Sequence, residues 1–171
     1  MNPSGPVRRE VGTNLDGADL KILAELAENS KAPYVEIGRK LGLHPNVVGY
    51  RVNRMEESGI IREYTTLIDF SKLGLSEQVL VAANFPSAAS RDDIVKQISE
   101  IPGTVNIISS LGSPEGLFHI VAKNKEDVNE VLSKLRSMNL EIEFASSVIK
   151  TYDEGRLGSF LRTIANPEQK D

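Results

Sequence analysis

Apolar residues recur at helical spacing through the first third of the chain. Between residues 15 and 59 they return every three or four positions, in three groups separated by polar or glycine-containing breaks: Leu15, Ile22, Leu23 and Leu26; Val35, Ile37 and Leu41; Val48, Val52 and Met55. This spacing predicts three short helices, each with one apolar stripe. Asp16 is suited to cap the first helix, and Gly42 and Gly59 are suited to end the second and third.

A very short turn separates the second helix from the third. Only residues 42–44 lie between them, and Pro45 stands where a proline fits a first helical turn. So short a turn makes the two helix axes cross steeply, as in a helix-turn-helix. Residues 15–60 are therefore predicted to form a helix-turn-helix domain. Residues 1–14 have no apolar periodicity and are predicted to be a flexible arm.

The period changes after residue 60. Residues 60–70 alternate, so the linker at 61–77 is predicted to contain an extended strand. A strand, helix, strand pattern then occurs twice, with strands at 78–85, 104–111, 117–123 and 141–150 and helices at 90–100 and 125–138. Ser90 and Asn124 are predicted to cap the two helices. The two halves predict a ferredoxin-like βαββαβ domain at 78–152, with a four-stranded antiparallel sheet, and the fold class is α+β.

One face of the predicted sheet has no helix to cover it. The strand at 78–85 is apolar on both sides, with Val79, Val81 and Ala83 alternating against Leu80 and Ala82. An uncovered apolar face of this kind usually marks a protein contact. A homodimer built sheet to sheet is therefore expected.

The segment 153–171 forms a C-terminal extension. Leu157, Phe160, Leu161 and Ile164 fall at helical spacing within it. Two interpretations stay open from the sequence: a short amphipathic helix docked on the protein's own assembly, and a disordered tail.

Composition narrows the chemistry that the chain can perform. The 171 residues include no cysteine and two histidines, which excludes disulfide scaffolds, thiolate metal sites and cysteine nucleophiles. No apolar run is long enough to span a membrane and no secretory signal is seen, so the expected compartment is the cytoplasm. His119 alternates with Leu117 and Val121 and is interpreted as a core or interface residue. No catalytic constellation, metal-ligand spacing or phosphate-binding loop is found, so no enzyme activity, metal or cofactor is predicted.

The third helix carries the candidate chemistry. With Val48, Val52 and Met55 turned to the core, its outer face carries Pro45, Asn46, Val47, Gly49, Tyr50, Arg51, Asn53 and Arg54. Asparagine can pair with adenine, arginine with guanine or phosphate, and valine can meet a thymine methyl, while glycine permits close approach. This face is predicted to bind double-stranded DNA. The alternative is a three-helix bundle whose polar face is only solvated.

Local charge supports the DNA prediction. The whole chain has a net charge of −4, but residues 31–62 carry six Lys or Arg against three Glu. This modest basic patch requires two copies to hold duplex DNA at physiological salt, because phosphate contacts weaken steeply as salt is added.

The same residues carry a family resemblance. Residues 15–61 resemble the N-terminal half of the Lrp/AsnC (feast/famine) transcriptional regulators, and the matching positions are Leu15, Asp16, Asp19, Ile22, Leu23, Leu26, Glu36, Ile37, Leu41, Gly42, Leu43, Val48, Arg51, Val52, Glu56, Gly59 and Ile61. The resemblance covers about residues 15–152. It implies a sequence-specific DNA-binding regulator with a βαββαβ sensing domain that dimerises through its sheet, assembles further into tetramers or octamers, and responds to an amino acid or related effector.

The chain departs from the family pattern at several positions. His44 and Pro33 stand where the family usually has serine before the third and second helices; His44 is interpreted as a weak cap or turn residue, with a phosphate-facing role as the alternative. The loop between the second and third strands lacks the family's threonine and aromatic residue. The candidate effector-binding residues there are Ser109, Ser110, Leu111, Gly112, Ser113 and Glu115, with a plain hairpin loop as the alternative. Glu115 is suited to bind the ammonium group of an amino acid, and the serine hydroxyls and the Gly112 backbone are suited to bind its carboxylate.

An enzyme class shares this architecture and is the second hypothesis. The sirohaem decarboxylases resemble Lrp/AsnC proteins, but their tryptophan-bearing substrate loop is missing from a chain that has no tryptophan. The resemblance to the regulators is therefore favoured.

Overall fold

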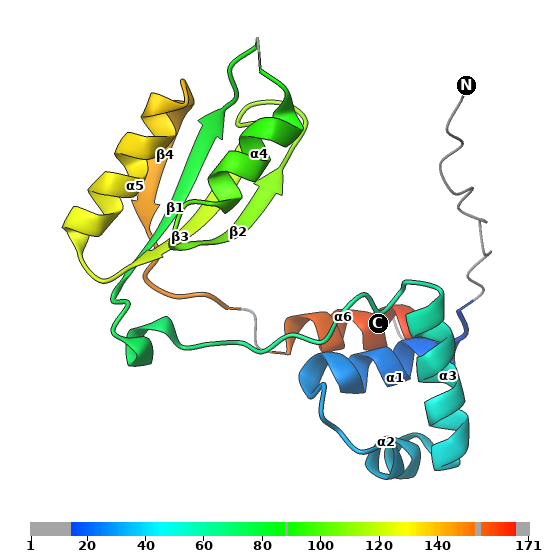
Figure 1. Ribbon diagram of the computed structural model, residues 1–171. Helices are drawn as coiled ribbons and strands as arrows, with labels where there is room; N and C mark the ends of the chain where they lie inside the picture. Colours follow the sequence, from blue (N-terminus) through cyan, green and yellow to red (C-terminus); the bar gives the residue numbers. More distant parts are fainter. Residues whose placement is uncertain (1–14, 88, 153–154, 167–171) are drawn as a thin grey trace, which may run out of the picture. The chain divides into compact units, whose positions relative to one another are not determined.

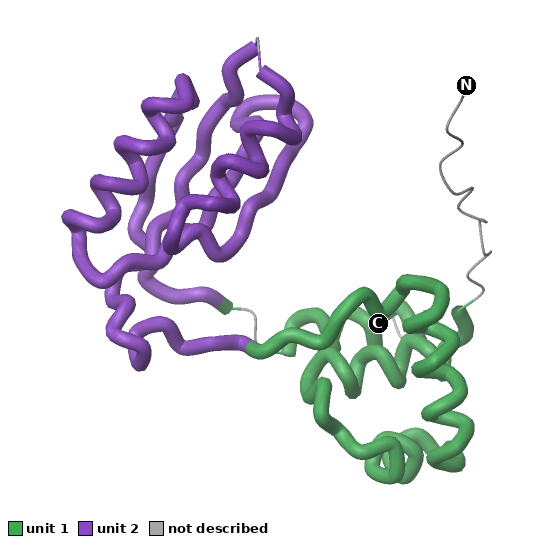
Figure 2. Tube along the Cα trace, in the orientation of Figure 1, with its two compact units in different colours: residues 1–66, 152–171 green, residues 67–151 purple. Residues whose placement is uncertain are grey.

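Two compact units make up the chain. The computed structural model describes residues 15–87, 89–152 and 155–166. One unit comprises residues up to Thr66 together with those from Tyr152 onward, and the other comprises Leu67–Thr151 (Figure 2). The predicted arm at 1–14 and part of the predicted C-terminal extension lie outside the described residues. The unit that contains residues up to Thr66 is called the helical unit, and Leu67–Thr151 is called the sheet unit.

The helical unit contains the three predicted helices, α1 (Gly17–Glu28), α2 (Tyr34–Leu41) and α3 (Pro45–Glu57). Their apolar stripes meet in one core of buried side chains, made by Ile22, Leu26, Ile37, Val48, Val52 and Met55. Asp16 caps α1 in a reciprocal capping box with Asp19, and Gly42 ends α2 in the left-handed conformation. The structure therefore confirms the three helices predicted from the helical spacing of apolar residues and from the capping residues at the helix ends.

A fourth helix completes this unit. The C-terminal segment forms α6 (Arg156–Ala165), which lies alongside α1 (Figure 1). The two helices touch where side chains are smallest: Gly158 of α6 is buried against Ala24 and Glu28, and Gly17 lies against the Ala165 carbonyl. The helical interpretation of the extension is thus the one that the structure adopts, and the helix docks on the helix-turn-helix itself.

The sheet unit has four strands in the order β2-β3-β1-β4, and each neighbouring pair is antiparallel. The strands are β1 (Glu77–Asn84), β2 (Thr104–Ser109), β3 (Gly116–Ala122) and β4 (Glu141–Ser147). Helices α4 (Arg91–Ser99) and α5 (Lys125–Ser137) lie on the same face (Figure 1). The predicted α+β class and ferredoxin-like order are confirmed.

The covered face of the sheet forms the core of this unit. Val81, Phe118 and Ile120 from the strands meet Ile98 of α4 and Leu135 of α5, and all are almost fully buried. Alternate residues point to the opposite face, where Ile108 and Phe144 are about half exposed. Side chains alternate between the two faces of a strand. The structure therefore agrees with the prediction that one face of the sheet is covered by helices and the other is open and apolar.

The short helix η1 (Phe70–Leu73) touches the open face of the sheet. Its Phe70 ring stands edge-on to His119, with the ring centroids 6.3 Å apart. The His119 Nε2 atom is buried without a hydrogen-bond partner among the described residues, and burial lowers the pKa of this imidazole. This supports the interpretation of His119 as a core or interface residue.

Two local predictions are wrong. Residues 62–69 form no strand, because a strand requires a neighbouring edge for its backbone groups and the described part of the chain offers none there. Ser90 makes no side-chain capping bond to α4. Asn124 caps α5 as predicted, since its side chain accepts from the Asp127 N–H at 2.8 Å.

Candidate nucleic-acid interface

The outer face of α3 is exposed over much of the predicted length. Asn46, Val47, Tyr50 and Asn53 are exposed, and Tyr50 is 68% exposed. Asn46, Tyr50 and Asn53 follow one another at spacings of four and three, so they share one side of the helix. These four residues are called the reading face below. Pro45 is half-buried at the start of the helix.

The turn that presents this face depends on Gly38 of α2. The Leu43 N–H donates to the Gly38 carbonyl at 2.9 Å. A Cβ atom at Gly38 would lie 2.4 Å from the Leu43 carbonyl oxygen, so a side chain does not fit. Gly38 was not among the predicted site residues, although a glycine inside a helical pattern was the available signal.

His44 caps α3. Its Nδ1 accepts a hydrogen bond from the Asn46 N–H at 3.2 Å. The ring thus satisfies one of the donors that a helix N-terminus leaves free. The favoured interpretation of His44 as a cap is confirmed.

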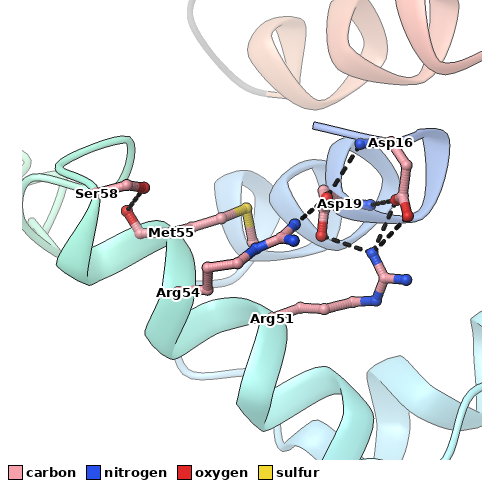
Figure 3. Close-up of polar contacts among 6 residues, drawn as sticks. All are labelled: Asp16, Asp19, Arg51, Arg54, Met55 and Ser58. Carbon is pink, nitrogen blue, oxygen red and sulfur yellow. Dashed lines mark hydrogen bonds and ion pairs between the residues drawn. The ribbon is translucent and has the colours of Figure 1, made fainter. Parts of the chain in front are cut away.

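Arg51 and Arg54 form ion pairs with α1 (Figure 3). Arg51 Nη1 lies 2.8 Å from Asp16 Oδ2 and 2.8 Å from Asp19 Oδ1, and Arg54 Nη2 lies 2.5 Å from Asp19 Oδ2. The hydrogen bonds to Asp16 and Asp19 raise the pKa of Arg51, and Arg51 lowers the pKa of Asp16. These arginines were expected to point outward, and the structure instead joins them to α1.

The reason for this arrangement is the burial of Asp19, whose side chain has no exposed surface. A buried carboxylate is costly unless cations and hydrogen bonds compensate it. Arg51 and Arg54 supply both. They therefore fix α3 to α1, a role that the spacing of charges along α3 alone did not indicate.

Gly49 makes room for an aromatic ring of the protein. A Cβ atom at Gly49 would lie 3.3 Å from Cδ2 of Tyr34, which stands at the start of α2. The glycine was expected to let DNA approach, and here it accommodates Tyr34.

On the connector after α3, the Tyr64 hydroxyl donates to Glu56 at 2.7 Å, and burial together with Glu56 raises the pKa of this phenol. Both partly exposed tyrosines were missed.

The candidate effector-binding residues lie at the end of β2 and in the loop that joins it to β3. Its Glu115 is bound on both oxygens: Oε1 accepts from Arg91 Nη2 and Oε2 accepts from the Phe85 N–H, each at 2.8 Å. Arg91 also donates to the Ser110 carbonyl at 2.6 Å and to the Ser109 hydroxyl at 3.2 Å. Glu115, expected to receive a ligand's ammonium group, holds the loop to α4 instead.

The tip of this loop is tied to β4. The Ser113 hydroxyl donates to Glu143, whose carboxylate also accepts from Asn84 Nδ2 at 2.8 Å. The hydrogen bond from Ser113, followed by that from Asn84, lowers the pKa of Glu143. Leu111 is 99% exposed, and Gly112 has a φ of +103°. The six candidate residues therefore lie together in a loop with an exposed apolar tip.

Acid is expected to destabilise the helical unit through Glu25. Its carboxylate is 10% exposed and pairs with Lys40 Nζ at 2.6 Å and with Arg162 Nη2 at 3.0 Å. The Lys40 hydrogen bond and then the Arg162 bond lower the Glu25 pKa from its ordinary value of 4.5. Because the pKa is lower in the folded chain, this stabilisation is complete above pH 4.5 and is lost as the pH falls through the folded pKa.

Urea unfolding followed by circular dichroism at a series of pH values tests this expectation. Glu25→Gln should lower stability at neutral pH and flatten the fall below about pH 4.5. Glu57→Gln, at an exposed position of α3, is the matched control and should follow the parent. Equal pH slopes for Glu25→Gln and the parent would contradict the assignment.

No group of three potential ligands lies close enough to hold a metal ion within the ranges 15–87, 89–152 and 155–166. Over the same ranges, no helix has the length and apolar character needed to cross a membrane.

Known proteins similar to this chain are DNA-binding regulators. Residues 15–62 match the family described as winged helix-turn-helix DNA-binding. The chain is 32% identical over 135 residues to the HTH-type transcriptional regulator Rv2324 of Mycobacterium tuberculosis. The aligned segment covers 79% of this chain and 90% of that relative. It is 25% identical over 136 residues to the regulatory protein AsnC of Haemophilus influenzae, covering 80% and 91%.

Solved structures agree with these relatives. The LrpC structure from B. subtilis has a TM-score of 0.71 and 28% identity, over 81% of this chain and 96% of that one. The transcriptional regulator NMB0573 of Neisseria meningitidis, solved as a complex with L-Met, has a TM-score of 0.70 and 26% identity, over 80% and 90%.

Proposed function

Because the chain belongs to the Lrp/AsnC family of transcriptional regulators and is a DNA-binding regulator, we propose that it recognises its operator through the reading face of α3. The observation that carries this proposal is the exposure of two amides, an aliphatic group and a phenol on one side of a helix that follows a tight turn. Such groups match the donor and acceptor edges of the major groove.

We assign different roles to the predicted DNA-binding residues. Asn46, Val47, Tyr50 and Asn53 contact the bases or the adjacent backbone. Pro45 and Gly49 shape the helix and its packing, and Arg51 and Arg54 position α3 through their ion pairs with α1. The outer edge of Arg54, which is 44% exposed, also lies within reach of a phosphate.

Alanine at Asn46 or Asn53 is expected to relax operator preference at one base position by about 1–3 kcal/mol. The physical reason is that an asparagine amide pairs with two atoms of one base edge, whereas alanine pairs with neither. Gel-shift titrations against an operator obtained by selection, and its single-base variants, measure this. Asn129→Ala, on an exposed face of α5, removes an amide outside the reading face and should change nothing. Parent-like base preference in both reading-face variants would exclude this face.

We propose that two copies pair through the open face of the sheet. Phe144 and Ile108 are large apolar side chains left about half exposed there, which is unfavourable in an isolated subunit. A homodimer buries them and brings two copies of α3 to half-sites about one helical turn, or a multiple, apart. Tetramers or octamers are built from such dimers.

Phe144→Asp is expected to convert the dimer into monomers and to weaken operator binding at least about 100-fold, because each half-site alone makes few phosphate contacts. Light scattering after gel filtration measures the mass, and fluorescence anisotropy measures the affinity. Val35→Asp places the same charge at an exposed apolar position of α2, outside the sheet unit, and should remain dimeric. A dimeric Phe144→Asp protein would exclude this face.

We further propose that the loop at 109–115 binds an amino acid or related effector. The relative solved with L-Met supports this class, and the Ser109 and Ser113 hydroxyls, with the backbone at Gly112, offer polar groups beside the apolar Leu111. Glu115 becomes available to an ammonium group only if Arg91 releases it. A thermal-shift screen of the common amino acids, including L-methionine, tests the proposal; Ser113→Ala should abolish any shift seen for the parent.

We infer that the chain acts as a regulator and carries no sirohaem decarboxylase activity. Its relatives are transcriptional regulators, and the buried Nε2 of His119, beside the Phe70 ring, is poorly placed to exchange a proton with a substrate. An absorbance assay with sirohaem should show no turnover.

A further inference from the structure

We propose that α6 is a second connection between the sheet unit and the recognition helix, through which changes at the β2–β3 loop and β4 alter DNA affinity. The effect on DNA affinity rests on the proposed function, whereas the docking of α6 on α1 does not depend on it.

Helix α6 packs closely against α1. Gly158 is buried, and a Cβ atom there would lie 3.1 Å from the Ala24 carbonyl oxygen and 2.9 Å from Glu28 Cγ. Near the other end, Gly17 approaches the Ala165 carbonyl closely enough that a Cβ would lie 3.2 Å away. The two helices therefore run antiparallel with their backbones close together, which needs glycine at Gly158.

Ion pairs strengthen this contact and extend it to α2. Arg162 binds Glu28 through Nη1 and lies 3.0 Å from Glu25 Oε1 through Nη2. The other Glu25 oxygen binds Lys40 of α2 at 2.6 Å. Since Glu25 is mostly buried, its charge requires these partners. The docked α6 is thus one of the two helices that supply a cation to this carboxylate.

The far end of α1 reaches the recognition helix. Asp16 and Asp19 start α1 and hold Arg51 and Arg54 of α3. The same helix, α1, is therefore held by α6 along its length and holds α3 at its start. A displacement of α6 bears on α1, and through α1 on the reading face.

The sheet unit is connected to α6 through β4. Glu143 of β4 receives the hydrogen bond from Ser113 in the loop proposed to bind the effector, and it also binds Asn84 of β1. β4 ends at Ser147 and α6 begins at Arg156, so eight residues separate them. A connector of that length spans about 30 Å at most when fully extended. The docked helix therefore limits how far the helical unit moves from the end of β4.

The chain thus passes between its two units twice, once from Thr66 to Leu67 and once from Thr151 to Tyr152. A helix that docks or leaves is an element with two discrete arrangements, and both the loop and the DNA can bias such an element. With α6 docked, fewer orientations are open to the helical unit, so less freedom is lost on DNA binding.

A distance measurement tests the docking step without DNA. The chain has no cysteine, so Lys31→Cys and Ser133→Cys, both at exposed positions, give two unique sites for spin labels, one in each unit. Labelled protein is diluted into excess unlabelled chain so that only distances within one chain contribute. Gly158→Leu should widen the distance distribution at least about twofold, because a leucine cannot fit against the Ala24 carbonyl.

Ser159→Leu places the same side chain on the exposed side of α6 and is the matched control; it should keep the parent distribution. Arg162→Gln provides a milder variant, with Arg156→Gln as its charge-matched control on the exposed side. Identical distributions for the parent and Gly158→Leu, or equal widening by both leucine variants, would overturn the docking step.

A double-mutant cycle tests the coupling step. Operator affinity is measured by anisotropy for the parent, Glu143→Gln, Gly158→Leu and the double variant. Glu143→Gln is expected to change affinity at least about twofold in the parent and to have no effect once Gly158→Leu has undocked α6. No effect of Glu143→Gln in the parent, or equal effects in both backgrounds, would overturn the coupling. A parent that binds no DNA would overturn the coupling and the proposed function together, while the distance measurement would still decide the docking.

Discussion

Replacing Arg51 and Arg54 together by alanine is expected to destabilise the helical unit by about 3–5 kcal/mol, because the fully buried Asp19 then keeps its charge without a partner. Operator binding should be lost at the same time, as α3 is no longer held to α1. Chemical unfolding monitored by circular dichroism measures the stability, and anisotropy measures the affinity.

Two further variants separate this positioning role from a direct DNA contact. Adding Asp19→Asn to the double variant removes the buried charge and should restore about half of the lost stability, while an amide oxygen can still accept from the Asp16 N–H. Arg39→Ala with Arg62→Ala removes two charges from exposed positions and should leave stability unchanged. If the Arg51 and Arg54 double variant stays as stable as the parent and only binds DNA less tightly, the two arginines contact DNA and do not position α3.

The substitution Gly38→Ala adds a single methyl group and is expected to lower both the stability of the helix-turn-helix and its operator affinity. On helix propensity alone this change would stabilise α2 by up to about 1 kcal/mol. The added Cβ would lie 2.4 Å from the Leu43 carbonyl, however, and backbone on both sides of the turn would have to shift. Such overpacking typically costs about 1–3 kcal/mol, so the net effect is a loss of stability. The shift also rotates α3, so operator affinity should fall at least about tenfold.

The sign of the Gly38→Ala effect decides this prediction. The control is Arg39→Ala, an exposed substitution on the same helix that changes propensity without touching the turn; it should be close to neutral in unfolding. A more stable Gly38→Ala protein with parent-like affinity would show that the turn tolerates a side chain, and would remove the argument that Gly38 sets the crossing of α2 and α3.

The C-terminal segment shows what periodicity alone leaves open. Its helical spacing predicted a helix, yet the face that docks on α1 is the one with Gly158, Arg162 and Ala165, and not the face with Leu157, Phe160 and Ile164, which stays exposed. An apolar stripe normally marks the buried side of a helix. The docking side here is selected by close backbone approach and by pairing with buried Glu25, and both depend on residues more than a hundred positions earlier in the chain.

The amino-acid sequence by itself determined α1 to α5 and the four strands, their order, the two cores and the resemblance to DNA-binding regulators, because hydrophobic period, capping residues and turn length act over a few neighbouring positions. The tertiary structure alone decided which charges are free. Arg51 and Arg54 look like outward groups in a helical projection, and Glu115 looks like a ligand for an ammonium group, but each has a partner brought in from another helix or strand. Ion pairing depends on distance in space, and a local pattern carries no record of which distant carboxylate becomes buried within reach of a guanidinium.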